Sequence, residues 1–539
     1  MKKPIVIISV IVAVVAAFFV VRSFQSKDSG EAPFVIAFEN DVVTLEPMRI
    51  ADVYSIRVAS QMFEGLARLN EKNEIVPSVA ESWSHTPDFT RWTFKLRPGV
   101  KFHPHPSLNE SARILTSADV VYSFTRMLAK DSIPSGPLAS VIQGASEYQN
   151  GEAKDVSGIR AVSDNEVEFI LKRPDAQFLG RAASPSYGLY KQAVVEAAGT
   201  AFGQSVAIGT GPYRFVERKG NDLILERYED YWGDNQGPKK VIFRTIKEDT
   251  VRLAEAKAGR LDATYATAPM LNGLVERDGD AIKIKQAFAN SLTAVSFPTY
   301  NTTFLAFNWP NIDPDLRRAI ASAVDREQIA KAVVPMSGKA DPDPIPYAST
   351  GYVSKIKATR DVTAAKVALE AYRAKNPGVQ PKIRILVHEL AQAVLIGEVL
   401  QSQLKEVGIE VEIVQQSFNA TIGLIQKKDF DAVVLWFEYM YAMPQLMLET
   451  YYTSGAIPIP NVFLYSEPRN DSSIAALFSI GDAKAALDQT AEAAKNLVAD
   501  NPGVFLYQTQ QVILVRPGIE GLRFNSSNLP FLSQVVVKK

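Results

Sequence analysis

The chain has 539 residues, enough for about three to four domains. Hydrophobic residues make up 47% of it and charged residues 22%, which is typical of a globular protein with a large core. The net charge of −1 gives no reason to expect a nucleic-acid partner. The lack of cysteine excludes disulfides, thiol catalysis, cysteine-ligated metal clusters and a lipid-modified cysteine.

The N-terminus has the pattern of an export signal. Lys2 and Lys3 precede an uncharged run of 18 residues, Pro4 to Val21, and Arg22 follows it. Such a run is near the lower limit for a helix that spans a bilayer. Residues 23–32 then form a polar linker. We predict that residues 1–32 are a signal peptide or membrane anchor plus linker, with the rest of the chain outside the cytoplasm.

Cleavage of this segment needs small residues just after the apolar core. Val15 and Ala17 have the required spacing, but a cut after Ala17 would leave the apolar residues 18–21 at the new N-terminus. A cleaved signal and a retained anchor both stay open, and the poor cleavage site favours the anchor.

A regular alternation of strand and helix patterns extends from Lys382 to Phe437. Residues 382–388 alternate as in a strand, and residues 396–407 have helical spacing with Gly408 at the expected helix end. A second strand is predicted over Ile409–Val414 and a short helix over Asn419–Lys427. The apolar run Asp431–Phe437 is typical of a strand buried on both faces, so the order predicts a parallel sheet covered by helices.

The stretch LWFEYMYAMPQ, Leu435 to Gln445, places one acid, Glu438, among aromatic residues at the end of this strand. Ligands of open α/β sheets bind outside the carboxyl ends of the strands. Each aromatic taken alone could be an ordinary core residue. The cluster with its single acid favours the lining of a ligand site.

Motifs for catalysis or cofactors are not evident in the sequence. Gly209 and Gly211 in IGTGPYRF lack the third glycine of a dinucleotide site, and they fit a turn that enters a strand better. The segment around Lys339 lacks the other residues of a P-loop. His103 and His105 could chelate a metal, but no third ligand is evident. The absence of such motifs favours a binding protein over an enzyme, and we expect no catalytic residues, cofactor or metal.

Several segments, in the same order, resemble the family 5 extracellular solute-binding proteins, the receptors of ABC importers that include oligopeptide- and dipeptide-binding proteins. The resemblance covers almost everything after the linker, and IVPSVAESWSHTPDFTRWTFKLRPGVKFH (Ile75 to His103) is its most specific part. The other matching segments are Thr44–Asn70, Leu115–Leu128, Gly209–Phe215, Leu225–Gly233, Ala254–Tyr265 and Phe304–Val334.

The resemblance implies an α/β, two-lobed periplasmic-binding-protein-like fold of type II, with an extra subdomain in the first lobe. We expect lobe I over residues 33–299, lobe II over 300–507 and a return to lobe I over 508–539. Two lobes joined by a hinge can enclose a ligand between them and exclude water.

The resemblance also implies a function. It predicts a monomeric receptor in the periplasm or on the outer face of the cytoplasmic membrane, which captures a small solute, a peptide in the first place, and delivers it to an inner-membrane permease. A sugar, an opine or a metal chelate is an alternative ligand. A membrane-anchored sensor or scaffold that uses the same fold without import is an alternative function.

The predicted ligand-binding residues are Trp436, Glu438 and Tyr439. In the peptide receptors, the similar strand end has Trp, an Asp three residues later that pairs with the peptide amine, and Pro four residues after it. Here Tyr439 stands in place of the Asp, Glu438 comes one residue early and Pro444 one residue late. We expect Glu438 to bind a ligand cation between aromatic walls. Strand alternation separates Trp436 and Glu438 from Tyr439, so all three reach a ligand only if the chain turns at Glu438, and we expect this turn.

The weak cleavage site predicts that residues 1–21 stay attached in a substantial fraction of the protein. N-terminal sequencing of material from the native host should therefore find the original N-terminus. A single clean start after Ala17, or anywhere before Phe34, would show instead that the segment is a cleaved signal.

Overall fold

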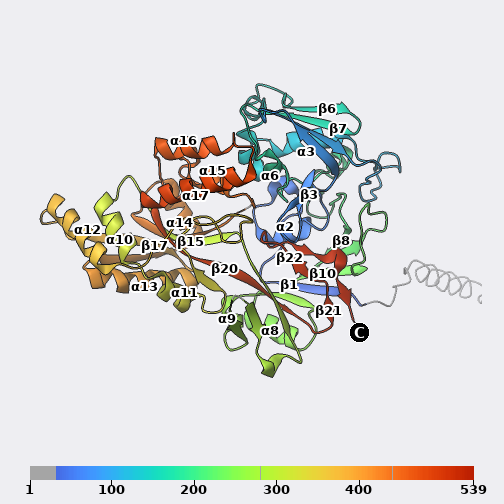
Figure 1. The fold of residues 1–539 in the computed structure, drawn as a ribbon. Coiled ribbons are helices and arrows are strands. Elements are labelled where there is room, and N and C mark those ends of the chain that lie inside the picture. Colours follow the sequence, from blue (N-terminus) through green and yellow to red (C-terminus); the bar gives the residue numbers. More distant parts are fainter. Residues whose placement is uncertain (1–31, 280, 440, 539) are drawn as a thin grey trace, which may run out of the picture.

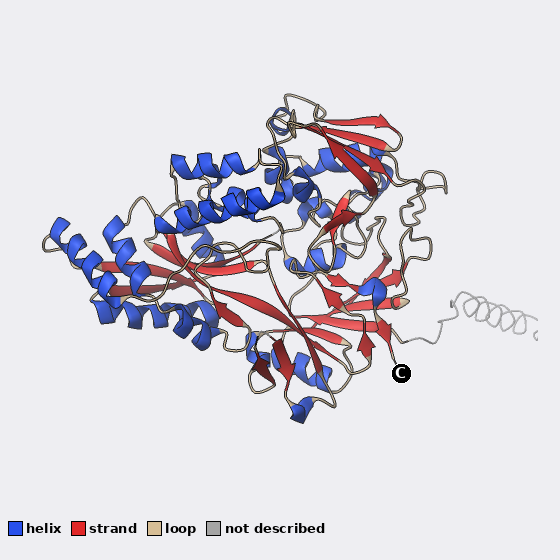
Figure 2. Cartoon of the chain, in the orientation of Figure 1, coloured by secondary structure: helices blue, strands red, loops and turns tan. Residues whose placement is uncertain are grey.

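Two lobes joined by one long sheet make up the protein, shown in the computed structural model of residues 32–279, 281–439 and 441–538 (Figures 1 and 2). The predicted signal or anchor lies outside the described residues. Among the helices of the described ranges, none is long and apolar enough to cross a membrane.

Lobe I is built on mixed strands packed between two hydrophobic layers. Its central strand β1 pairs in parallel with β10 and β11, and β9 and β8 extend the sheet in antiparallel pairing. One face carries the larger core, which includes α2, and the other face carries α8 and α9. These elements are β1 (Phe34–Phe38), α2 (Val53–Ala59), β8 (Tyr213–Lys219), β9 (Asp222–Arg227), β10 (Lys240–Thr245), α8 (Asp249–Lys257), β11 (Ala263–Ala266) and α9 (Ala268–Leu271).

An extra subdomain interrupts lobe I between β1 and β8. It has a four-stranded antiparallel sheet in the order β4-β5-β7-β6, with α3 against it. Its aromatic residues, such as Phe94 and Phe169, belong to the same continuous core as the lobe I sheet. Its elements are β4 (Ala80–His85), β5 (Arg91–Leu96), α3 (Ser117–Met127), α4 (Gly136–Ala139), α5 (Ala145–Gln149), β6 (Ile159–Ser163), β7 (Glu166–Ile170), α6 (Phe178–Ala182) and α7 (Gln192–Ala198).

The sheet of lobe II has the strand order β18-β17-β19-β15-β20, and helices cover both of its faces. Helices α10 to α13 cover one face and α14 to α17 the other (Figure 1). The elements are β15 (Asn301–Phe307), α10 (Pro314–Ala323), α11 (Arg326–Val333), α12 (Val362–Lys375), β17 (Lys382–His388), α13 (Ala391–Val407), β18 (Glu410–Gln416), α14 (Phe418–Gln426), β19 (Ala432–Glu438), α15 (Pro444–Tyr452), α16 (Pro468–Leu477), α17 (Ala483–Ala499) and β20 (Gly503–Val515).

The alternating segment of lobe II forms as its sequence predicts. Strands and helices over 382–438 appear in the expected order, and β17 pairs in parallel with both β18 and β19. Gly408 ends α13 in the left-handed conformation, with φ of 90°, which glycine adopts without a steric penalty. The element bounds differ from the prediction by no more than two residues, except that α13 begins at Ala391, five residues before the predicted 396.

Strand β20 connects the two lobes. Its first part, residues 503–507, pairs with β15 in lobe II, and residues 512–515 pair with β11 in lobe I. Strand β14 (Thr293–Pro298) pairs with residues 510–515 of β20, and β16 (Gly338–Ala340) with residues 507–509. The expected lobe boundary at 299/300 falls between β14 and β15, and the one at 507/508 falls inside β20. These boundaries stay predictions.

Short hairpins complete the structure outside the main sheets. After β20 the chain lies on lobe I, where Phe524, Leu532 and Val535 enter the larger core. The hairpin strands are β2 (Ala67–Leu69) with β3 (Ile75–Pro77), β12 (Val275–Asp278) with β13 (Ala281–Ile284), β21 (Ile519–Glu520) with β24 (Val536–Val537), and β22 (Arg523–Phe524) with β23 (Pro530–Phe531).

The glycine motif before β8 is a tight packing element, as its interpretation as a turn predicts. A Cβ on Gly209 would lie 2.2 Å from the carbonyl oxygen of Met62, and one on Gly211 would lie 2.7 Å from that of Gln61. Only glycine therefore lets this turn approach the end of α2.

Gly209→Ala should lower the free energy of unfolding by about 1–3 kcal/mol, because the added methyl group overlaps a backbone oxygen. Gly423→Ala is the matched control, since it lies in α14 with no heavy atom within 4 Å of the new Cβ. That change should be neutral or stabilising by about 0.4–1 kcal/mol. Urea unfolding of both variants measures the difference, and equal stabilities would contradict the close packing.

Candidate ligand-binding cleft

Strand β19 brings two of the predicted site residues to the space between the lobes. In the antiparallel register with β15, Trp436 lies opposite Thr303 and Glu438 opposite Asn301, so the four side chains share one face of the sheet. Trp436 remains 39% exposed and Glu438 is also exposed, although the preceding residues of the strand are buried. Glu438 is the last residue of the strand, and its side chain faces the cleft.

Tyr439, the third predicted residue, lies on the other side. It is 4% exposed in the lobe II core, where its hydroxyl donates to the carbonyl oxygen of Pro344 at 2.7 Å and contacts the Tyr452 hydroxyl at 2.7 Å. Tyr439 still contributes to the wall of the cavity between the lobes. The structure thus brings Trp436 and Glu438 onto one face and leaves Tyr439 at the edge, with its polar group already used.

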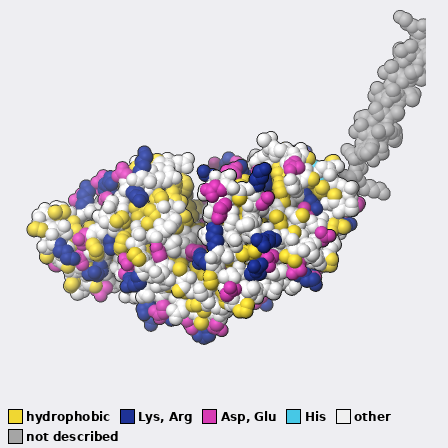
Figure 3. Space-filling model, turned by 90° about the horizontal axis from the view of Figure 1, so that it is seen from above, with side chains coloured by type: hydrophobic (Ala, Val, Ile, Leu, Met, Phe, Trp, Pro, Cys, Tyr) yellow, Lys and Arg dark blue, Asp and Glu magenta, His cyan; other side chains and the backbone are white. Residues whose placement is uncertain are grey.

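Two cavities meet at Glu438. One has a volume of about 190 Å³ and lies beside the lobe II sheet, where its polar lining includes Asn301, His388, Trp436 and Thr509. The other has about 160 Å³ and lies between lobe I residues such as Asp52 and Asn528 and lobe II residues such as Tyr439 and Tyr451. Glu438 lines both cavities. Figure 3 shows the groove between the lobes from above, with hydrophobic side chains on its wall.

The electrostatics of Glu438 follow from its place in the cleft. Its side chain is open to solvent, but protein surrounds the carboxylate on most sides, and this loss of hydration raises the pKa of Glu438 to about 7. The positive charge of Arg57 across the cleft acts in the opposite direction and lowers this pKa. Glu438 can therefore change its charge near neutral pH.

Arg57 itself is an unusual group that sequence reasoning missed. It is 3% exposed on α2 of lobe I, with its guanidinium 3.8 Å from the ring centre of Tyr265 and its Nε donating to the carbonyl oxygen of Asn528 at 3.3 Å. Its Nη1 has no hydrogen-bond partner in the described part of the protein. No pattern in the sequence marks Arg57, because its surroundings come from β1, β11 and the C-terminal segment.

Other side chains around the two cavities also have unused hydrogen-bonding capacity. Among the described residues, the buried atoms without a partner include His388 Nε2 on the lobe II side and Ser186 Oγ and Asn528 Oδ1 on the lobe I side. Buried polar atoms are paired in the great majority of cases. Their presence on both walls of the cleft indicates a surface that can hydrogen-bond a polar ligand.

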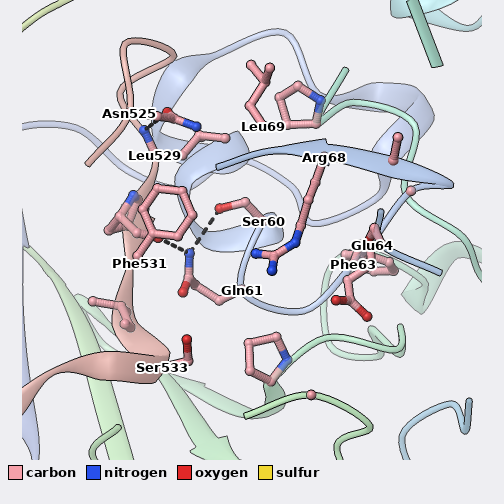
Figure 4. Close-up of a pocket in the computed structure, with 18 of the residues that line it drawn as sticks. Ser60, Gln61, Phe63, Glu64, Arg68, Leu69, Asn525, Leu529, Phe531 and Ser533 are labelled. Carbon is pink, nitrogen blue, oxygen red and sulfur yellow. Dashed lines mark hydrogen bonds between the residues drawn. The ribbon is translucent and has the colours of Figure 1, made fainter. Parts of the chain in front are cut away.

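A third cavity, of about 300 Å³, lies within lobe I (Figure 4). Glu64 at its side accepts hydrogen bonds from Trp232 Nε1 at 2.8 Å, Tyr231 hydroxyl at 2.8 Å and Thr210 Oγ1 at 2.9 Å. These residues come from three of the motifs that carry the family resemblance. Since Glu64 is buried and accepts from three donors, we interpret it as a structural acid that ties α2 to the glycine turn.

The histidines considered for a metal have other partners. Both ring nitrogens of buried His103 contact the backbone of the glycine turn, Nε2 with the Gly211 carbonyl oxygen at 2.9 Å and Nδ1 with the Gly209 N–H at 3.2 Å. His105 Nδ1 contacts the Ser107 hydroxyl at 2.8 Å. Within the described ranges, no group of three or more His, Asp or Glu side chains could hold a metal ion.

A comparison with known proteins identifies the family. The model of the bacterial extracellular solute-binding proteins, family 5 Middle, matches residues 74–458, which is most of the chain. The chain belongs to this family. The family consists of solute-binding proteins rather than enzymes, and the resemblance inferred from the sequence is confirmed.

Relatives of this solute-binding protein match along nearly its whole length. It is 24% identical over 514 residues to the dipeptide-binding protein DppE of Bacillus subtilis, covering 92% of this chain and 90% of that protein. It is 23% identical over 540 residues to the periplasmic murein peptide-binding protein MppA of Escherichia coli, covering 96% of each.

Solved structures show the same fold. The unliganded open form of MppA matches with a TM-score of 0.76 at 23% identity, covering 94% of this chain and 98% of that chain. HbpA2 from Haemophilus parasuis matches with a TM-score of 0.78 at 19% identity, covering 94% of this chain and 100% of that chain. The predicted two-lobed α/β fold is confirmed.

The raised pKa of Glu438 predicts how stability depends on pH. The native state holds the Glu438 proton up to about pH 7, whereas an unfolded glutamate loses its proton near the ordinary pKa of 4.5. Between these values the unfolded state gains stability by ionising, so this residue lowers the stability of the ligand-free protein as pH rises from 5 to 8. Glu438→Gln removes this effect, and the variant should gain stability relative to the wild type over that range.

Urea unfolding of the ligand-free proteins at pH 5 and pH 8 measures this relative stability. Glu410→Gln is the control, because Glu410 is exposed at the start of the edge strand β18, away from the cleft. A stability difference between Glu438→Gln and the wild type that does not change with pH would contradict the desolvation of Glu438.

Proposed function

We propose that this solute-binding protein is the extracytoplasmic receptor of an ABC importer and that it binds a short peptide between its lobes. The observation that supports this most is Glu438, whose carboxylate lines both cavities, and the walls of these cavities carry unpaired polar atoms from both lobes. A peptide has a cationic amine for the carboxylate and backbone groups for the polar walls. The names of the relatives DppE and MppA, as dipeptide- and murein peptide-binding proteins, support the same ligand class.

Each wall of the cleft has a role in this proposal. Glu438 binds the amine, and the face of Trp436 beside it also attracts a cation. Aromatic surface such as that of Tyr439 and Tyr451 accepts side chains of varied shape. His388, Ser186 and Asn528 offer hydrogen bonds to peptide groups. Because the protein only captures and releases its ligand, it needs no catalytic residue, cofactor or metal.

The proposed setting follows from the family. The receptor acts as a monomer in the periplasm or on the outer face of the cytoplasmic membrane, where it presents the liganded, closed lobes to the permease. An N-terminal tether would keep it there and concentrate it near that partner. Permease and ATPase genes beside this gene would support import, whereas their absence would favour the sensor or scaffold alternative.

Glu438→Gln should weaken binding of a dipeptide by at least about thirtyfold, because it removes one partner of a desolvated ion pair worth about 2–5 kcal/mol. Native mass spectrometry with a dipeptide mixture first selects the ligand, and calorimetry then compares wild type, Glu438→Gln and the surface control Glu410→Gln. The wild-type affinity should also fall as pH decreases from 8 to 6, because protonation neutralises Glu438.

N-acetylation of the selected dipeptide removes the ligand's positive charge, so the acetylated peptide should bind wild type and Glu438→Gln equally weakly. If the free dipeptide also binds both proteins equally, Glu438 is not the amine site. If no dipeptide binds the wild type, the ligand belongs to another class, such as a sugar, an opine or a metal chelate.

A further inference from the structure

The lobes touch at a second place besides the connecting strands. Helix α6 and the segments beside it, in the extra subdomain of lobe I, pack against α15 and the end of α16 in lobe II. Figure 1 shows α6 next to α15. The residues in contact are separated by more than 250 positions in sequence.

Charged groups lie at the centre of this contact. Arg181 and Asp175 of the extra subdomain are both fully buried and paired, with Arg181 Nε 2.7 Å from Asp175 Oδ2. Glu449 of α15 bonds Arg181 through one carboxylate oxygen and Arg173 through the other. Two guanidinium groups of lobe I thus hold one carboxylate of lobe II, and the four charges balance.

Apolar and neutral contacts surround this cluster. The guanidinium carbons of Arg173 and Arg181 lie 5.1 Å and 5.0 Å from the ring centre of Phe478, and the Ala176 N–H donates to the Phe478 carbonyl oxygen at 2.8 Å. The hydroxyls of buried Tyr187 and Tyr441 lie 3.0 Å apart. The contact therefore combines charge, cation–π and hydrogen-bond interactions across the two lobes.

The same segments form the wall of the cavity between the lobes. Pro185 and Ser186 follow α6 and line that cavity, and Tyr451 is two residues from Glu449 on α15. The cross-lobe contact consequently lies at one end of the ligand space, and separating its halves widens the exit from that space.

We propose that Arg173, Arg181 and Glu449 form a reversible lock that holds the lobes closed and controls ligand release. Opening leaves no buried charge alone, because Arg181 keeps Asp175, while Glu449 and Arg173 become hydrated. The lock can therefore open at a moderate cost in free energy. A buried ion pair would cost more to separate if one of its charges stayed buried without a partner. The effect on ligand release rests on the proposed function, whereas the effect on closure does not.

X-ray scattering of the ligand-free protein tests closure directly. Glu449→Gln keeps the side-chain shape but removes the only lobe II charge of the lock, so its radius of gyration should exceed that of the wild type. Glu492→Gln is the matched control, because Glu492 pairs with Lys355 and Lys495 on the surface of lobe II alone. The control should have the wild-type radius.

A second variant keeps the test valid if Glu449→Gln does not fold. The nearest heavy atoms to a Cβ added at Gly180 belong to Met443 and Leu446 of lobe II. Gly180→Leu should therefore push the lobes apart, and its radius of gyration should also be larger than that of the wild type. Equal radii for the wild type and both variants would overturn the lock.

Ligand release gives an independent measurement. Stopped-flow dissociation of the dipeptide selected by mass spectrometry should be about tenfold faster from Glu449→Gln than from the wild type or Glu492→Gln. Unchanged release with a larger radius would show that the contact holds the lobes but does not control release. If no peptide binds, the proposed function fails, while the scattering result still decides whether the lock exists.

Discussion

The hydrogen bonds of strand β20 are the constraint on which the other features of the protein depend. This single strand completes the lobe II sheet with its first residues and the lobe I sheet with its last ones. The strand register between the two lobes is therefore fixed. The end of β19, which β15 and β20 separate from β11 in the sheet, faces α2 because both are anchored to sheets that share β20. The position of Glu438 opposite Arg57 is a consequence of this shared strand.

The cleft keeps several groups in an unfavourable environment. Glu438 is poorly hydrated, Arg57 leaves a buried N–H without a partner, and His388 leaves a ring nitrogen unpaired. Each of these costs stability in the free protein. By contrast, Glu64 and the Asp175–Arg181 pair find their hydrogen-bond partners within the protein. The unpaired groups at the cleft are thus free to bind a ligand, whereas the polar groups of Glu64 and of the Asp175–Arg181 pair are already used within the protein.

The sequence predicts some of these features and cannot predict others. The elements from β17 to β19 follow from periodicity, because their hydrophobic faces are set by local spacing and Gly408 marks a helix end. Glu438 could be placed at a strand end by the same reasoning. Arg57 and His388 could not be recognised, because their neighbours are distant in sequence. The pairing of Arg181 with Glu449 spans 268 positions and leaves no local pattern.

The orientation of the site residues shows the limit of local reasoning. Alternation correctly separates Trp436 and Glu438 from Tyr439. Whether Tyr439 also reaches a ligand depends on how lobe I covers the end of β19. That covering comes from Asp52 and Asn528, more than 450 residues apart.

The return of the chain to lobe I has a consequence for biosynthesis. Lobe II takes its strands from residues 301–507, whereas lobe I needs β20 and the core residues Phe524, Leu532 and Val535 from the end of the chain. As the chain emerges from the ribosome, the second lobe can complete its sheet while the first still lacks an interior strand. The sheet and core of lobe I then remain incomplete for most of synthesis. If the chain is exported in an unfolded state, this late completion of lobe I would favour passage through a translocation channel.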